Sequence, residues 1–319
     1  LSPIGYYTSI VSFQFIQTIA SLLAKIMVLS YILEKIPVVT EDPFLQYRPF
    51  PEVPKTLFQK HWHEIFASFT FYFIIQQLSG PIFSIIMGPR YTKLSRSTRV
   101  NFDVHVTSMV QCFVSFALMV PHLNNPHWVN RLNDPANSLL RSTDFGGLVC
   151  ALTVGYFIWD LYVCAKYFSL FGVGFLFHGF AAMYAFATGF VPYCQPWAGP
   201  FLTFELSTPF VNINWFASKL PAGTFSEKTI IINGILLMVT FFIVRIVWGF
   251  YAVSQLAVDM LASLDQVNKL LPISLLVLNF LLNSLNVFWF YKMVMIARKK
   301  ARGQESTREA AKEVREKIE

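Results

Sequence analysis

The chain alternates between long apolar segments and short polar connectors. Eight apolar segments stand out, at 6–33, 63–88, 104–123, 146–168, 172–190, 198–217, 229–256 and 271–297. Runs of about 20 apolar residues have the length that an α-helix needs to cross a bilayer. The alternation of apolar and polar positions that is typical of membrane β-barrels is not seen. The pattern therefore predicts an all-α integral membrane protein with about eight transmembrane helices.

The sixth segment, 198–217, differs from the others because polar and helix-breaking residues interrupt it. Pro200, Glu205 and Pro209 all fall within its apolar run. Membranes tolerate a broken helix where neighbouring protein satisfies the backbone groups that the break sets free. We expect a short or broken helix here.

The distribution of charge predicts an orientation in the membrane. Of the 319 residues, 55% are apolar and 13% are charged, with a formal net charge of +7. Most charged residues lie outside the apolar segments, and no soluble nucleic-acid-binding motif accompanies them. The connector 89–99 and the basic run after residue 297 fall on one side, which the positive-inside tendency places in the cytosol with both termini. We interpret the connector 34–60, on the opposite side, as a folded lumenal segment.

Ionisable residues inside the apolar segments are the candidates for function. Each costs about 2.5–3.5 kcal/mol at the bilayer centre, so each needs a partner or a polar cavity. The helical rise places Asp160 about 12 Å and His178 about 9 Å from the cytosolic edge, on consecutive antiparallel helices. A contact between them would orient the imidazole and raise its basicity, as general bases and nucleophiles require. The alternative is a purely structural pair.

Other polar residues gather in the same half of the predicted bundle. His105 and Gln111 lie on the third segment, Asn212 on the sixth and Asn286 on the eighth. This bias predicts a cavity open to the cytosol or inner leaflet, and interhelical hydrogen bonding is the alternative role. The same depth arithmetic places Arg245 near the lumenal side, as an orienting ion-pair partner.

Catalytic motifs of other kinds are missing from the sequence. It has no HExxH motif and no spaced histidine cluster, so we expect no metal site. A GxSxG elbow is absent too, which argues against a serine hydrolase. The four cysteines form no CxxC pair and are interpreted as reduced packing residues.

Several strings of the sequence resemble the signatures of the TLC-domain family, which includes the ceramide synthases. They are LTVGYFIWDLYVC, FLFHGFAAMYAFA, FELSTPFVNINWF, FSEKTIIINGILLMVTFFIVRI and NSLNVFWFYKM. The resemblance covers about 95–298 and is closest to the TLC domain-containing protein 4 subgroup, also called transmembrane protein 56. It implies a barrel-like bundle of six helices around a lipid-sized cavity, in an endoplasmic-reticulum or other secretory-pathway membrane. Residues 1–94 would add two N-terminal helices and a Pro-rich connector, and 299–319 a charged cytosolic tail.

The resemblance also implies a chemistry. In ceramide synthases a histidine pair and acidic residues on a later helix serve acyl transfer from acyl-CoA. His178 corresponds to the first histidine, Gly179 stands where this subgroup usually has the second, and Glu205 is the acidic residue of the later helix. We therefore expect a lipid-binding protein that processes acyl lipids by transfer or hydrolysis, with His178 and Asp160 as catalytic residues. The expected cavity lining consists of Glu205, Asn212, Trp215, Tyr184, Asn286, His105 and Gln111.

The expected partners are membrane lipids and a fatty-acyl group, with acyl-CoA as a candidate substrate, no resident cofactor and no nucleic acid. Two further functions stay open. The first is a non-catalytic lipid binder or regulator of membrane lipid composition. The second is a lipid transporter, which would need a continuous polar groove across the membrane.

Overall fold

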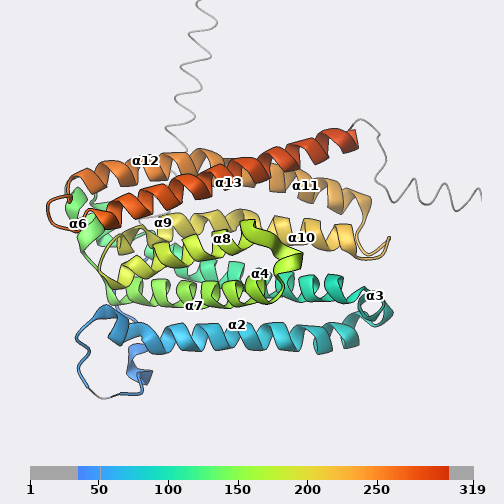
Figure 1. The fold of residues 1–319 in the computed structure, drawn as a ribbon, viewed down its shortest axis with the longest axis horizontal. Helices are drawn as coiled ribbons and strands as arrows, with labels where there is room; N and C mark the ends of the chain where they lie inside the picture. The colour runs from blue at the N-terminus through green and yellow to red at the C-terminus, as the bar shows by residue number, and fades with distance from the viewer. Residues whose placement is uncertain (1–34, 51, 302–319) are drawn as a thin grey trace, which may run out of the picture.

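The computed structural model describes residues 35–50 and 52–301, and these form a bundle of long helices without any strand (Figure 1). Within this part, six segments are long and apolar enough to cross a membrane: Leu57–Met87, Arg96–His122, Asp144–Lys166, Phe168–Phe190, Glu227–Leu261 and Leu270–Arg298. These findings confirm an all-α integral membrane protein. The predicted first span, 6–33, and most of the charged tail lie outside the described residues.

The long helices begin at polar caps that precede the apolar runs. Thr56, Ser95, Thr143 and Ser226 each accept a hydrogen bond from a backbone N–H in the first turn of the helix that follows. The helices therefore start earlier than the apolar pattern predicted, because the first turns are polar. The four capped helices are α2 (Leu57–Met87), α4 (Arg96–His122), α7 (Asp144–Lys166) and α11 (Glu227–Phe241). The other long helices are α8 (Phe168–Ala187), α12 (Trp248–Leu261) and α13 (Leu270–Ala301).

Short elements connect the long helices at the two ends of the bundle. The end that carries α3 (Pro89–Thr92) and the last turns of α13 is called the cationic end here (Figure 1). The opposite end carries α6 (Pro135–Leu140) and is called the α6 end. The remaining connecting elements are η1 (Leu45–Tyr47), α5 (Pro126–Val129), η2 (Thr188–Phe190) and η3 (Gln195–Trp197).

The expected sixth segment is broken into three short pieces, as its prolines indicated. They are α9 (Ala198–Leu202), η4 (Thr203–Ser207) and α10 (Thr208–Lys219), and together they are called the broken segment. Pro209 lies in the first turn of α10, where its missing N–H leaves no hydrogen bond unmade. The carbonyl of Pro200 accepts hydrogen bonds from Trp248 Nε1 at 3.0 Å and Thr203 Oγ1 at 2.7 Å. Side chains thus donate hydrogen bonds to a backbone carbonyl group that the break in the helix leaves without its helical partner.

The span that follows is continuous but contains a widened turn. A π-helical turn, η5 (Phe242–Val247), joins α11 to α12 and carries Arg245. Turns of this kind occur mostly inside α-helices and often at functional sites. The widened turn places a guanidinium in the longest apolar span of the described chain.

Glycines on α7 allow α2 to lie directly against the bundle. A Cβ atom at Gly155 would lie 2.5 Å from the carbonyl oxygen of Ile65 on α2. Beside this contact, Ser68 Oγ donates a hydrogen bond to the carbonyl of Leu152 at 2.7 Å. Small residues and interhelical hydrogen bonds are the usual means of close helix packing in membranes.

This contact generates a stability prediction. Gly155→Ala should lower the midpoint of thermal unfolding in detergent, because the added methyl group must push α2 away at a cost of about 1–3 kcal/mol. The matched control is Gly234→Ala on α11, where no atom outside the neighbouring backbone of that helix lies within 4 Å of the added carbon. That control should leave the midpoint unchanged or raise it, and equal midpoints for both variants would show that α2 does not pack as described.

Candidate functional site

An elongated cavity lies inside the bundle, between α4, α7, α8, the broken segment, α12 and α13. The space between its lining atoms is about 950 Å³, including the part that is open to the surroundings. The volume of the cavity itself is only about 90 Å³, so the cavity is narrow. Most lining side chains are apolar, among them Phe157, Phe186, Leu202, Leu256 and Leu275. This shape suits a linear hydrocarbon chain better than a bulky group.

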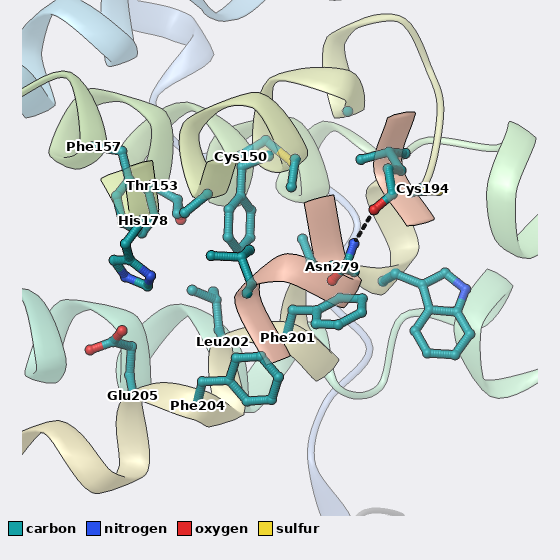
Figure 2. A pocket seen from close by; sticks show the side chains of 18 of the residues that line it. Cys150, Thr153, Phe157, His178, Cys194, Phe201, Leu202, Phe204, Glu205 and Asn279 are labelled. Atoms are coloured by element: carbon teal, nitrogen blue, oxygen red, sulfur yellow. Dashed lines mark hydrogen bonds between the residues drawn. The ribbon is translucent and has the colours of Figure 1, made fainter. Parts of the chain in front are cut away.

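The cavity extends from the middle of the bundle toward the α6 end. Phe157 lies about 20 Å along α7 from its first residue by helical rise, and Leu275 lies in the first turns of α13. Figure 2 shows His178 and Glu205 at one side of the cavity and Cys194 at the other. The polar residues of the sequence predicted a cavity open to the cytosol or inner leaflet, whereas this cavity begins in the middle of the bundle.

His178 on α8 presents its imidazole to the cavity. Its ring contacts are edge-on, with centroids 6.1 Å from Phe157 and 5.5 Å from Trp289. Within the described residues no protein group makes a hydrogen bond to either ring nitrogen. In Figure 2 the imidazole and the carboxylate of Glu205 point toward one another. The ring nitrogens are therefore available to a ligand.

Asp160 lies on α7 beside the residue that follows His178. Its Oδ2 would be 2.7 Å from a Cβ atom at Gly179, and its Oδ1 is 3.9 Å from Cys164 Sγ. In the described part of the chain no hydrogen bond joins Asp160 to His178, and Asp160 does not line the cavity. Its carboxylate fills the space that a second histidine at 179 would need.

Glu205 and Arg245 place opposite charges at the same end of the cavity as His178. Arg245 Nη2 lies 4.0 Å from Glu205 Oε1, while its Nε and Nη2 donate to Ser207 Oγ at 2.9 Å and Thr208 Oγ1 at 3.1 Å. Both charged residues line the cavity, and Arg245 is 8% exposed. Arg245 is an ion-pair partner, as predicted from the sequence, but its depth in the membrane differs from the predicted depth near the lumenal side. Because α12 continues to Leu261, Arg245 lies about 24 Å from that end and thus near the middle of its span.

Two other expected residues also line the cavity. Gln111 accepts a hydrogen bond from the Tyr72 hydroxyl of α2 and donates one to Ser115 Oγ at 2.9 Å. Asn286 lines the cavity from α13 and is 4% exposed. Both add polar groups to the lining that contains His178.

The remaining expected residues lie elsewhere. His105 Nδ1 is 2.7 Å from Asn212 Oδ1, and the His105 ring stacks on Trp215 with centroids 4.4 Å apart. Asn212 also donates to Ser108 Oγ at 3.2 Å, so these groups satisfy one another between α4 and α10. These side chains therefore pair with one another between the two helices and do not line the cavity beside His178. Tyr184 makes a 2.7 Å hydrogen bond with Ser274 Oγ and links α8 to α13 outside the lining.

The far part of the lining was not predicted from the sequence. Cys194 and Trp197 come from the connector after α8 and line the cavity near Cys150. Burial, with the nearby Asp259 and Cys150, raises the pKa of Cys194 well above that of an ordinary thiol. Cys194 is therefore a thiol rather than a nucleophilic thiolate. Cys194 has a left-handed backbone conformation, with φ 61°. The sequence pattern does not indicate this conformation, so the contribution of the connector to the cavity could not be predicted.

Comparison with known proteins identifies the family. The TLC-domain family model matches residues 101–295. The chain belongs to the TLC-domain family. It is 36% identical over 267 residues to topoisomerase I damage affected protein 4 of Saccharomyces cerevisiae, covering 82% of this chain and 92% of that protein.

Other TLC-domain relatives come from yeast and vertebrates. An uncharacterised TLC domain-containing protein of Schizosaccharomyces pombe is 37% identical over 252 residues, which cover 79% of this chain and 84% of that protein. Human TLC domain-containing protein 4 is 32% identical over 168 residues, which cover 51% of this chain and 61% of that protein.

The charge pair at the cavity generates a second prediction. Glu205→Gln and Arg245→Met should each lower the thermal midpoint, because each leaves a charge without its counterpart inside the bundle. The double variant should lose less than the sum of the two, by about 1 kcal/mol, in a double-mutant cycle measured in detergent. Strictly additive effects would show that the two charges do not interact.

Proposed function

We propose that this TLC-domain protein binds one acyl chain in the central cavity and processes the acyl lipid at His178. The observation that carries the proposal is an imidazole without a protein hydrogen-bond partner at the end of a narrow apolar cavity, beside the Glu205–Arg245 pair. The chain would lie among the apolar side chains, and its carbonyl group would lie beside His178 and Arg245. Membrane lipids are then the source of the acyl group, with acyl-CoA as a further candidate donor.

The residues support acyl transfer to water, an alcohol or an amine. His178 takes a proton from the acceptor as the acceptor atom forms a bond to the carbonyl carbon. The carbonyl electron pair moves onto oxygen, where N–H groups of Arg245 stabilise the negative charge. When the tetrahedral intermediate collapses, the bond to the leaving group breaks, and the imidazolium returns its proton to that group. Asp160 acts through packing on Gly179, next to His178.

A non-catalytic lipid binder is the second candidate, and one observation favours it. No carboxylate makes a hydrogen bond to His178 within the described residues, whereas activated histidines in catalytic triads are oriented by such a partner. A transporter has less support, because the cavity lining does not extend into the cationic half of the bundle. For either role we place the protein in a secretory-pathway membrane, with the cationic end in the cytosol.

The catalytic proposal predicts turnover that depends on His178. Purified protein incubated with acyl-CoA or a fluorescent acyl lipid should release the acyl group, and His178→Ala should reduce the rate by at least about 100-fold. The control is His127→Ala, which removes an imidazole of α5 outside the cavity and should keep full turnover.

Native and denaturing mass spectrometry separate the two candidates. Lipid that dissociates on denaturation and binds equally to wild type and His178→Ala, without any turnover, would contradict catalysis and support the binder. Both variants are compared with wild type by thermal midpoint and size-exclusion profile, so that loss of folding is not mistaken for loss of activity.

A further inference from the structure

A cluster of ionisable side chains lies at the α6 end, outside the lining of the cavity beside His178. Asp42 in the connector before α2 meets His61 and Glu64 in the first turns of that helix, and these three residues are called the α2 cluster. His61 Nδ1 lies 2.8 Å from Glu64 Oε2 and 3.3 Å from Asp42 Oδ2. Each residue offers one atom that could bind a metal ion, and these three atoms lie within 4.8 Å of one another.

The α2 cluster is buried and rigidly framed. His61 is 0% exposed, Glu64 3% and Asp42 8%. The backbone N–H of Phe44 donates to Asp42 Oδ1 at 2.8 Å, which orients this carboxylate. A Cβ atom at Gly147 would lie 2.1 Å from His61 Nε2, so only glycine on α7 leaves room for the imidazole.

The connector that supplies Asp42 is itself held against the bundle. The N–H of Phe145 donates to the Thr40 carbonyl at 2.9 Å, and Asn124 Nδ2 donates to the Ile36 carbonyl at 2.7 Å. The position of the Asp42 carboxylate is therefore fixed by contacts of the connector with α7 and with the turn after α4. A site assembled in this way needs no rearrangement of the backbone before a ligand binds.

The α2 cluster contains more acidic than basic groups. Two carboxylates face one imidazole, and Asp42 Oδ2 and Glu64 Oε1 accept no hydrogen bond from the described residues although both atoms are buried. Lys60, the residue before His61, pairs instead with Asp144 at 2.5 Å. Burying carboxylates without full compensation is costly, and a divalent cation would compensate the charges of both carboxylates.

We propose that the α2 cluster binds a divalent transition-metal ion of the Zn²⁺ class through His61 Nδ1 and the carboxylates of Asp42 and Glu64. Nitrogen and carboxylate ligands lie about 2.0–2.2 Å from zinc, so tetrahedral ligands are about 3.3 Å apart, close to the spacing of these atoms. Ca²⁺ and Mg²⁺ take oxygen ligands and do not suit an imidazole.

A neighbouring histidine supports the site independently. His63 Nε2 lies 3.8 Å from Glu64 Oε1, and both of its ring nitrogens are buried without a hydrogen bond from the described residues. This side chain can complete the coordination or hold Glu64 from outside it. The ion would fasten the connector to α2 and thereby α2 to α7.

The test is metal content and metal-dependent stability of the full chain, purified in detergent with a tag that lacks histidines. We expect about one zinc per chain by elemental mass spectrometry. A chelator should lower the thermal midpoint, and ZnCl₂ should restore it, whereas MgCl₂ and CaCl₂ should not. Zinc far below one per chain together with a midpoint that zinc does not change would overturn the proposal.

Near-isosteric variants assign the ligands. Asp42→Asn and Glu64→Gln should weaken zinc binding by at least about tenfold and abolish the zinc-dependent shift of the midpoint. The matched control is Asp259→Asn, another buried carboxylate at the α6 end, which instead pairs with Arg131 at 3.7 Å and Ser138 at 2.9 Å. Equal zinc affinity in all three variants would place the metal elsewhere and contradict the assignment. None of these measurements depends on His178 chemistry.

Discussion

A single guanidinium in the most apolar span holds the interior of this bundle together. Arg245 emerges from the π-helical turn between α11 and α12 and donates hydrogen bonds to Ser207 and Thr208, where η4 meets α10. Its charge also faces Glu205 at 4.0 Å. An arginine at this depth is costly without partners, and a broken helix needs donors and a fixed position. The broken segment supplies the acceptors and the carboxylate that Arg245 needs, and Arg245 supplies donors that hold the broken segment in place.

The cavity follows from this arrangement. A continuous helix at 198–219 would present a uniform ridge of side chains to its neighbours, whereas the broken segment turns Phe201, Leu202, Phe204 and Glu205 toward the interior. The resulting space is apolar toward the α6 end and polar in the middle of the bundle. His178 lies at the polar part, and this placement explains why an imidazole is tolerated in an apolar helix.

The sequence was sufficient for the class of protein and for the position of most spans. Runs of apolar residues mark the helices directly, and the prolines of the broken segment show in the sequence itself. His178, Glu205, Gln111 and Asn286 could be placed at the cavity because polar side chains in an apolar helix turn away from lipid. The motifs that resemble the TLC domain pointed to the same family that the comparisons identified.

Contacts between helices were beyond the sequence pattern, since depth along a helix does not fix its rotation about the axis. Asp160 and His178 lie on neighbouring helices, yet the carboxylate packs on Gly179. His105 and Asn212 bind each other, so two polar groups expected at the cavity instead link α4 to α10. The α2 cluster escaped notice because Asp42 reaches His61 only through the fold of the connector, and no linear motif records that fold.

The central claim is that the cavity beside His178 receives an acyl chain, and photo-crosslinking tests it most directly. A fatty acid with a diazirine near the end of its chain would be incorporated into membranes containing the protein, irradiated, and its adducts mapped by peptide mass spectrometry. We expect adducts on lining residues of α8 and α13 such as Phe186 and Leu275, and their loss when a large side chain fills the cavity in Ala182→Trp. Adducts confined to outward-facing residues such as Ile235 and Phe280, and equal in Ala182→Trp, would contradict the claim.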